Sequence, residues 1–301
     1  SVFSFVADPL QYLAGVGVIV MAAAGATRLH SRLGRPLATG LALALLAALG
    51  VLSWRQSRMY RDAETLYRRT LAQNPDAWLA HGNLGALLVK SGRYEEAMGH
   101  LLTAQKFHPE KTELMYSLGL ALLHLQRPAE AIPQFEGLLS VRPDDVEGLG
   151  DLGDALMKLN RVTEAIPYYE RAVGLKPDLP GVQNNLGYAL IATGRPTEAV
   201  GHFKHVLQLT PNDIDAHYNL GLVYVHLGRL PEAIVEDEAV LRLKPGDADA
   251  HFNLGDALLR AGRVDDSIPH FQEALRLNPD YARARAELDM ARREGRPVPF
   301  R

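Results

Sequence analysis

The stretch "AHYNLGLVYVHLGRLPEAI", Ala216–Ile234, predicts a helical hairpin. Its first half carries a stripe at the i, i+3, i+4, i+7 spacing of one helix face, formed by His217, Leu220, Gly221 and Tyr224. Gly228-Arg229 breaks this pattern, so we expect the first helix to run from Ile214 to about Leu227. Pro231 suits the first turn of a second helix, where a missing N–H has no hydrogen bond to lose.

The same pattern recurs at a step of 34 residues. The Leu-Gly pair occurs at positions 84/85, 118/119, 152/153, 186/187, 220/221 and 254/255. The turn arginine occurs at 93, 127, 161, 195, 229 and 263, and a proline closes the copies at 109, 143, 177, 211, 245 and 279. Because a single helix pair cannot bury both of its faces, the six copies are expected to stack into a solenoid.

This unit resembles the tetratricopeptide repeat (TPR) family, whose members form right-handed α-solenoids of helix pairs. The resemblance covers six copies at residues 78–281. A half repeat at 57–77 precedes them, in which Ala63, Tyr67 and Pro75 fit the second helix alone. The segment "ARARAELDMARREGR" predicts a capping helix at 282–295, followed by a tail at 296–301. The predicted fold is therefore all-α.

Two windows near the start, Pro9–Thr27 and Pro36–Trp54, contain no charged residue. About 20 apolar residues of helix span a bilayer core, and a central charge would cost roughly 2.5–3.5 kcal/mol. We therefore expect a two-helix transmembrane hairpin at residues 1–56, with helices at about 10–27 and 37–54. The alternative is two buried helices of a soluble domain. Since the chain starts at Ser1 rather than Met, we expect it to be a piece of a longer protein or a processed one.

The segment "FVADPLQYLAGVGVIV", Phe5–Val20, is followed by a second span and the repeats. This order resembles the C-terminal part of bacterial relatives of the transmembrane-and-TPR-containing glycosyltransferases, which are polytopic enzymes implicated in protein O-mannosylation. The resemblance implies a multi-pass membrane protein with extracytoplasmic repeats, whereas the arginines on the two sides of the hairpin nearly balance. The family's catalytic acidic residues lie in early external loops that this chain does not contain. We therefore expect no catalytic residue here.

A polar residue precedes Leu-Gly in every copy, and this row, called the asparagine row below, consists of Asn83, Ser117, Asp151, Asn185, Asn219 and Asn253. The TPR resemblance places it on the concave groove. It is similar to the asparagine ladder in the repeats of O-GlcNAc transferase, which implies pairing of the amides with the backbone of an extended peptide. Flanking groove positions would add contacts from Tyr116, Tyr218, Phe252, Asp154, Tyr188 and Asp256. Alternatively, the row satisfies neighbouring groups inside the repeats, and Ser117 and Asp151 interrupt it.

The composition limits other chemistry. There is no cysteine, which excludes disulfides and thiol catalysis, and the formal net charge of -3 gives no basic field for nucleic acid. His202 and His205 stand at i, i+3 without an evident third ligand, so we expect no metal and no cofactor. Asp237 occupies a position that is aromatic in four of the other five copies. It is interpreted as part of a solvated or loosened second helix, or as a site for a basic partner.

The sequence thus favours a membrane-anchored scaffold whose groove binds extended peptide segments or a partner protein. The alternative is the acceptor-binding C-terminal tail of a polytopic membrane glycosyltransferase for protein O-glycosylation. A third hypothesis is a scaffold for envelope assembly, bound permanently to a folded subunit. The sequence does not indicate whether the chain forms homo-oligomers.

Overall fold

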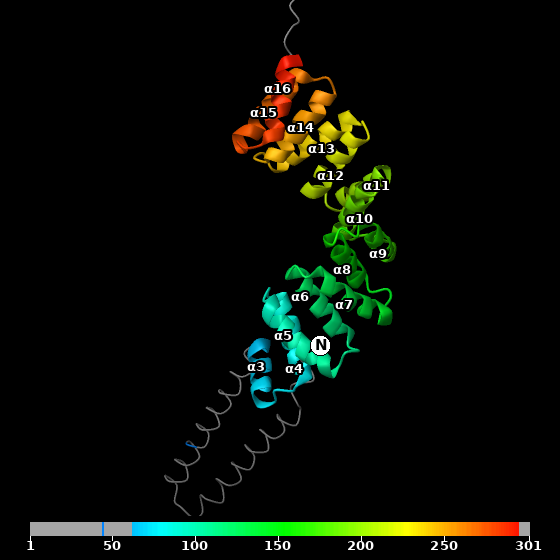
Figure 1. Cartoon of the computed structure of the whole chain (residues 1–301), viewed down its shortest axis with the longest axis vertical. Coiled ribbons are helices and arrows are strands. Elements are labelled where there is room, and N and C mark those ends of the chain that lie inside the picture. Colours follow the sequence, from blue (N-terminus) through cyan, green and yellow to red (C-terminus); the bar gives the residue numbers. More distant parts are fainter. Residues whose placement is uncertain (1–43, 45–61, 295–301) are drawn as a thin grey trace, which may run out of the picture. The chain divides into compact units, whose positions relative to one another are not determined.

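The computed structural model describes Ala44 and residues 62–294, and its described residues form fourteen helices and no strand (Figure 1). The first of these helices is α3 (Ala63–Gln73), and the last is α16 (Ala282–Glu294). Between them lie six pairs: α4 (Trp78–Lys90) and α5 (Tyr94–Phe107), α6 (Thr112–His124) and α7 (Pro128–Val141), α8 (Val146–Lys158) and α9 (Val162–Leu175), α10 (Pro180–Ala192) and α11 (Pro196–Leu209), α12 (Ile214–His226) and α13 (Leu230–Leu243), α14 (Ala248–Arg260) and α15 (Val264–Leu277). The fold is an all-α array of helix pairs.

The predicted transmembrane hairpin, with helices at about 10–27 and 37–54, lies outside the described residues. Among the helices that are described, none has the length and apolar character needed to cross a membrane.

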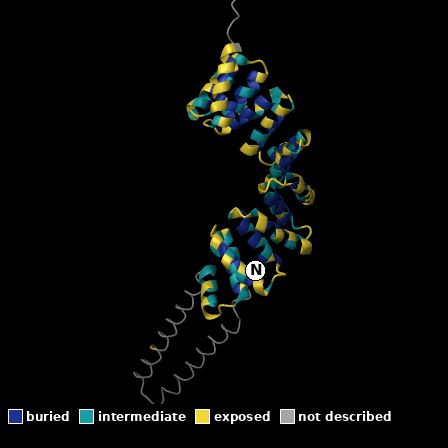
Figure 2. Ribbon diagram, viewed as in Figure 1, coloured by how far each residue is buried: buried dark blue, intermediate teal, exposed yellow. Residues whose placement is uncertain are grey.

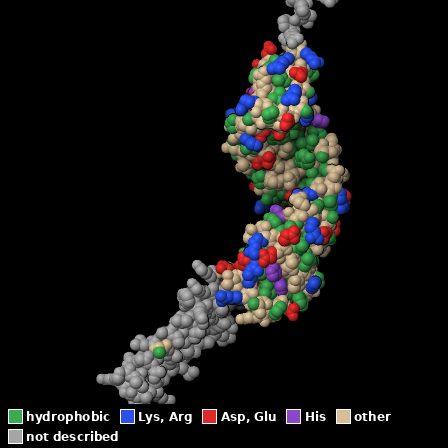
Figure 3. Space-filling view, turned by 60° about the vertical axis from the view of Figure 1, so that its left-hand side comes forward, with side chains coloured by type: hydrophobic (Ala, Val, Ile, Leu, Met, Phe, Trp, Pro, Cys, Tyr) green, Lys and Arg blue, Asp and Glu red, His purple; other side chains and the backbone are tan. Residues whose placement is uncertain are grey.

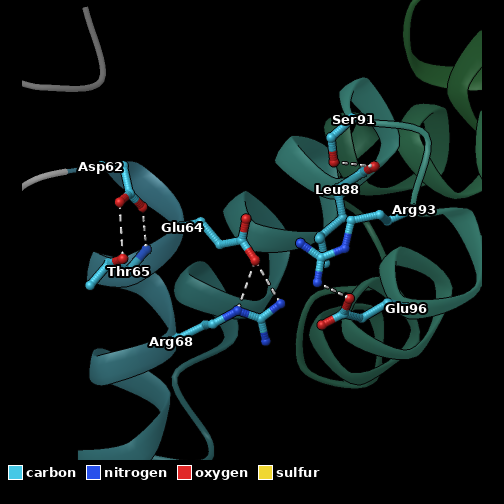
Figure 4. A network of polar contacts seen from close by, with 8 residues as sticks. All are labelled: Asp62, Glu64, Thr65, Arg68, Leu88, Ser91, Arg93 and Glu96. Carbon is cyan, nitrogen blue, oxygen red and sulfur yellow. Dashed lines mark hydrogen bonds and ion pairs between the residues drawn. The ribbon is translucent and has the colours of Figure 1, made fainter.

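The chain divides into two compact units, Ser1–Leu84 and Gly85–Arg301. In the first unit, α3 begins directly after Asp62, whose carboxylate accepts hydrogen bonds from the Thr65 backbone N–H at 2.7 Å and from the Thr65 hydroxyl at 3.0 Å (Figure 4). An aspartate at this position satisfies an N–H group that has no partner inside the helix. Glu64 and Arg68, one turn apart, then pair along the helix at 2.9 Å.

The turn inside each pair ends the first helix in one recurring way. In the fifth pair, Gly228 has a φ of +71°, and the Arg229 N–H donates to the Tyr224 carbonyl at 2.8 Å. This left-handed residue with a hydrogen bond back across the last turn is the Schellman motif. The corresponding residues also have positive φ, namely Gly92, Gln126, Asn160, Gly194 and Gly262. The predicted break at Gly228-Arg229 is confirmed.

The turn arginine opens the second helix. Arg229 pairs with Glu232, three residues further on, at 2.7 Å. An arginine paired with an acidic residue three positions later opens the second helix of each of the six pairs. Figure 4 shows Arg93 with Glu96 at the start of α5. These ion pairs are exposed, so they fix the local geometry of the turn more than they stabilise the fold.

In the ribbon coloured by burial, the buried residues lie toward the inside of the stacked helices (Figure 2). Each pair is packed around the glycine of its Leu-Gly step. Phe203 of α11 lies on Gly187 of α10 so closely that a Cβ at Gly187 would meet the Phe203 ring at 2.6 Å. A large apolar side chain takes this place in five pairs, namely Leu101, Phe135, Tyr169, Phe203 and Phe271, and each is fully buried. The glycine is therefore needed because the two helices approach each other too closely for a side chain.

Within the second unit, the first helices contact one another from pair to pair: α6 with α8, α8 with α10, α10 with α12, and α12 with α14. The described second helices of that unit make no such contact with one another. When a stack curves, the helices on the inside of the curve come closer together. The first helices therefore form the inner face of this unit, and α6, α8, α10, α12 and α14 define what we call the inner face below.

Candidate functional site

The inner face carries five of the six members of the asparagine row, and all five are partly buried. Asn83 is also partly buried and lies on α4, within the first unit. The row is therefore neither fully buried nor fully exposed. Which of its polar groups are already used depends on their neighbours.

At the third pair, the row is tied into a network. Asp154 of α8 accepts hydrogen bonds at one carboxylate oxygen from the Asn185 amide at 2.7 Å and from the Tyr169 hydroxyl at 2.5 Å. On the same helix, Asp151 lies next to the Tyr116 side chain of α6. These contacts join α6, α8, α9 and α10. At this pair, the Asn185 amide is therefore engaged inside the array.

The network holds two carboxyl groups in a low-dielectric position. Burial, followed by the charge of the nearby Asp154, raises the pKa of Asp151 to about 7, although the neighbouring Tyr116 hydroxyl opposes the shift. Burial also raises the pKa of Asp154, while Tyr169 and Asn185 partly offset the effect. Burial, followed by the charge of Asp154, raises the pKa of Tyr169. The tyrosines therefore remain hydrogen-bond donors to these carboxyl groups at neutral pH.

Further along, the row is less engaged. The side chain of Asn219 of α12 makes no hydrogen bond among the residues that the structure describes. Asn253 of α14 lies within reach of Tyr218, yet its amide nitrogen is buried and has no hydrogen-bond partner in the described structure. On α12 and α14, two amide groups of the asparagine row therefore lack hydrogen-bond partners within the described residues.

Two flanking residues differ in how far they reach the surface. Tyr188 of α10 is 57% exposed. Asp256 of α14 pairs with Arg260 at 2.9 Å and is largely covered. Ser117 of α6 is partly buried, and no described hydrogen bond connects it to the rest of the row.

Phe252 does not lie at an open inner face, contrary to the sequence-based prediction. It is only 4% exposed and packs with Phe271, with its ring centroid 5.1 Å from that of Tyr281. The Arg283 guanidinium, at the start of α16, stands 4.8 Å from the Phe252 ring centroid. The C-terminal helix that closes the array also covers this residue.

Of the interpretations of Asp237, that of a solvated side chain is wrong. The residue is 1% exposed, and both carboxylate oxygens lack a hydrogen-bond partner within the described residues. It takes the place of the buried aromatic residue and lies on Gly221, where a Cβ would stand 2.4 Å from Asp237 Oδ1. Burial raises the pKa of Asp237 to about 8, and the charges of Glu236 and Asp256 act in the same direction.

Sequence reasoning also missed Asn184, whose side-chain oxygen is buried without a partner among the described residues. It stands 34 residues before Tyr218, so the repeat itself assigns it to the inner face. No cluster of three or more potential metal ligands occurs in the described part of the chain. Over the face shown in Figure 3, basic side chains are interspersed with acidic ones and form no continuous basic patch.

Comparison with known protein families identifies the family to which this repeat belongs. A tetratricopeptide repeat family model matches residues 47–112, 100–137, 116–180 and 237–282. The chain belongs to the tetratricopeptide repeat family. A second TPR model matches residues 187–228. These repeats are protein-interaction scaffolds, and the TPR fold predicted from the spacing is confirmed.

Several characterised proteins share the repeat region. Protein O-mannosyl-transferase Tmtc2 of Drosophila melanogaster is 37% identical over 115 residues, which is 37% of this chain and 12% of that protein. Type IV pilus assembly protein PilF of Pseudomonas aeruginosa is 36% identical over 76 residues, covering 25% of this chain and 30% of that protein. A crystal structure of MamA is 26% identical with a TM-score of 0.54, covering 58% of this chain and 96% of that one. The TPR chain thus spans only a small part of Tmtc2 and of PilF.

Proposed function

We propose that the inner face of the second unit binds extended polypeptide segments and thereby acts as a non-catalytic scaffold for protein partners. The observation that carries this proposal is the set of polar groups on α10, α12 and α14 without internal partners, namely the Asn219 amide, the Asn253 amide nitrogen and the Asn184 side-chain oxygen. Partly or fully buried polar groups of this kind are stabilised when a ligand supplies the missing hydrogen bonds.

An extended peptide fits these groups chemically. Its backbone presents one N–H donor and one C=O acceptor at each residue except proline, and a side-chain amide can pair with both. Asn185 is the exception within this part of the row, because its amide nitrogen already donates to Asp154. Binding is therefore centred on the segment from Asn184 to Asn253 instead of following all six copies.

The test combines Asn219→Ala and Asn253→Ala in one variant. The matched control is Asn212→Ala, which removes an exposed amide from the loop before α12. Binding is measured against an array of unstructured peptides of varied sequence. Two lost hydrogen bonds of about 1 kcal/mol each should weaken binding roughly tenfold or more. If the double variant, the control and the parent chain bind equally well, Asn219 and Asn253 do not contribute to peptide binding.

A second candidate function follows from the match to Tmtc2 and its relatives. In it, the repeats hold the acceptor polypeptide for a membrane O-mannosyl-transferase whose catalytic part lies outside this chain. Residues 1–56 would then be the membrane hairpin, and residues 57–295 an extracytoplasmic array. Binding energy from segments remote from the reacting group would position the acceptor.

This candidate is tested on the native protein in its own membranes. An intact mass far above 33.0 kDa, together with protection of the repeats from protease added on the cytoplasmic side, is the expected result. Repeats that are cleaved from the cytoplasmic side would contradict this candidate and leave the peptide-binding scaffold standing.

A further inference from the structure

In each pair, one side chain of the second helix lies on the glycine of the Leu-Gly step. The third pair shows how far such a side chain can extend toward the inner face. The ring of Tyr169 of α9 lies over Gly153, and its hydroxyl donates to Asp154 at 2.5 Å. The same Asp154 oxygen also accepts a hydrogen bond from the Asn185 amide. A tyrosine-sized side chain at this position therefore extends from the glycine to the asparagine row.

In the fifth pair a shorter side chain of the chain itself starts along the same path. Asp237 stands at the position of Tyr169, and Asn253 at that of Asn185, each 68 residues later. An aspartate side chain ends one atom beyond the carbon at which a tyrosine ring begins. At one end of the path both Asp237 oxygens lack partners, and at the other end the Asn253 nitrogen does, within the described residues. Leu222, at the position of Asp154, supplies no polar group between them.

The missing partner of Asp237 must be a donor, and the surroundings favour a positive one. Glu236 and Asp256 are the charged groups that act on Asp237, and both are acidic. Arg260 is paired with Asp256, and His217 is paired with Glu236 at 2.6 Å. A buried carboxyl group with no donor costs free energy, and the apolar residues of the other pairs show that the fold does not require it.

We propose that the Asp237 carboxylate accepts hydrogen bonds from the ammonium group of a lysine side chain, and that this lysine belongs to a polypeptide bound on the inner face. This inference rests on the proposed function. The lysine would enter beside Tyr218 and Asn253, and its four-carbon stem would lie along the path that the Tyr169 ring takes in the third pair. Its ammonium group would then reach the carboxylate over Gly221.

Lysine fits this site better than the other cations. Its ammonium group is compact and sits on a thin, flexible, apolar stem, whereas arginine ends in a wide planar group. A metal ion would need further ligands, and no group of three potential ligands occurs among the described residues. The stem would also bury apolar surface against Leu222 and the neighbouring core.

The experiment uses peptides that bind the intact chain and contain lysine. Each lysine is replaced in turn by norleucine, which keeps the stem and removes the ammonium group. One replacement should weaken binding to the parent chain at least tenfold. The same replacement should have no effect with Asp237→Phe, which restores the aromatic core of the other pairs. Asp215→Asn, at an exposed site on α12, is the control for general electrostatic attraction and should keep the preference for lysine.

The outcomes separate this inference from the proposed function. If peptides bind but norleucine replaces every lysine without loss, or if Asp237→Phe keeps the lysine preference, the lysine site is disproved while peptide binding stands. If no peptide of the array binds, the proposed function fails. The site is then tested directly with butylammonium chloride, by the carboxyl carbon resonance of Asp237. No saturable shift of that resonance, or the same response to tetramethylammonium, would disprove the lysine site as well.

Discussion

At residue 237, a buried carboxyl group stands where four other pairs bury an aromatic ring. Burial raises the pKa of Asp237 to about 8. Since the folded chain holds this proton more tightly than the unfolded chain, the stabilising contribution is complete below the unfolded pKa. It is lost as the pH rises toward the folded pKa.

We predict that the parent chain loses stability relative to Asp237→Asn between about pH 4 and about pH 8, by an amount on the order of a few kcal/mol. Urea unfolding of both proteins across this range measures the difference. Asparagine has no charge to desolvate, so the variant serves as the reference. Parallel curves for the two proteins would show that Asp237 does not titrate with a raised pKa.

Restoring the ring at residue 237 should stabilise the fold. Asp237→Phe replaces an unpaired carboxyl group with the side chain that the second, fourth and sixth pairs use over the same glycine. We expect the free energy of unfolding to rise by about 1–3 kcal/mol at neutral pH. The reverse change, Phe203→Asp, should lower it. If Asp237→Phe lowers stability, the fifth pair is not built like the others.

Single residues also show where sequence reasoning stops. The position of Asn219 on the inner face follows from its place before Leu-Gly, and its lack of a hydrogen bond depends on what surrounds it. Asn185 has the same place in the repeat, but its amide nitrogen donates to Asp154. Phe252 is covered because a C-terminal helix packs on it. Such differences arise from contacts between copies, which a repeat pattern does not specify.

At the level of the helix pair, sequence reasoning succeeds because the constraints are local. The predicted first helix from Ile214 to about Leu227 is observed as Ile214–His226. Positive φ at Gly228 explains why glycine, glutamine or asparagine ends each first helix, since these residues tolerate the left-handed region better than branched ones.

The close approach of paired helices is tested by two glycine substitutions. Gly187→Ala in α10 would place a Cβ 2.6 Å from the Phe203 ring and should lower the free energy of unfolding by about 1–3 kcal/mol. Gly201→Ala in α11 meets no atom within 4 Å and should be neutral or raise it by up to about 1 kcal/mol. Thermal or urea unfolding distinguishes the two. Equal effects would show that the helices of a pair are not in tight contact.

On the scale of the second unit, stability is transmitted from neighbour to neighbour. The last pair is closed by α16, whose Leu288, Ala284 and Ala291 pack with Phe252 and Phe271. In a one-dimensional array, weakening this cap acts first on the adjacent pair and only slightly on distant ones.

We therefore predict that Leu288→Ala, which removes roughly 2–5 kcal/mol of core packing, speeds hydrogen exchange in α14, α15 and α16. Exchange in α6 and α7 should stay close to that of the parent chain. Exposed Met290 on the same helix offers the control Met290→Ala, for which neither region should change. Uniform acceleration throughout the unit would mean that it unfolds as one cooperative body.

The central claim is that the inner face is where polypeptides bind, and one photocrosslinking measurement tests it most directly. Tyr188→p-benzoylphenylalanine places a crosslinker of similar shape on α10 at a side chain that is 57% exposed. The same residue at Lys204, exposed on the second helix α11, is the comparison. With the pool of binding peptides, we predict many crosslinks at position 188 and few at position 204. Combining Asn219→Ala with Asn253→Ala should suppress the crosslinks at position 188. Crosslinks at 204 that equal or exceed those at 188 would contradict the account.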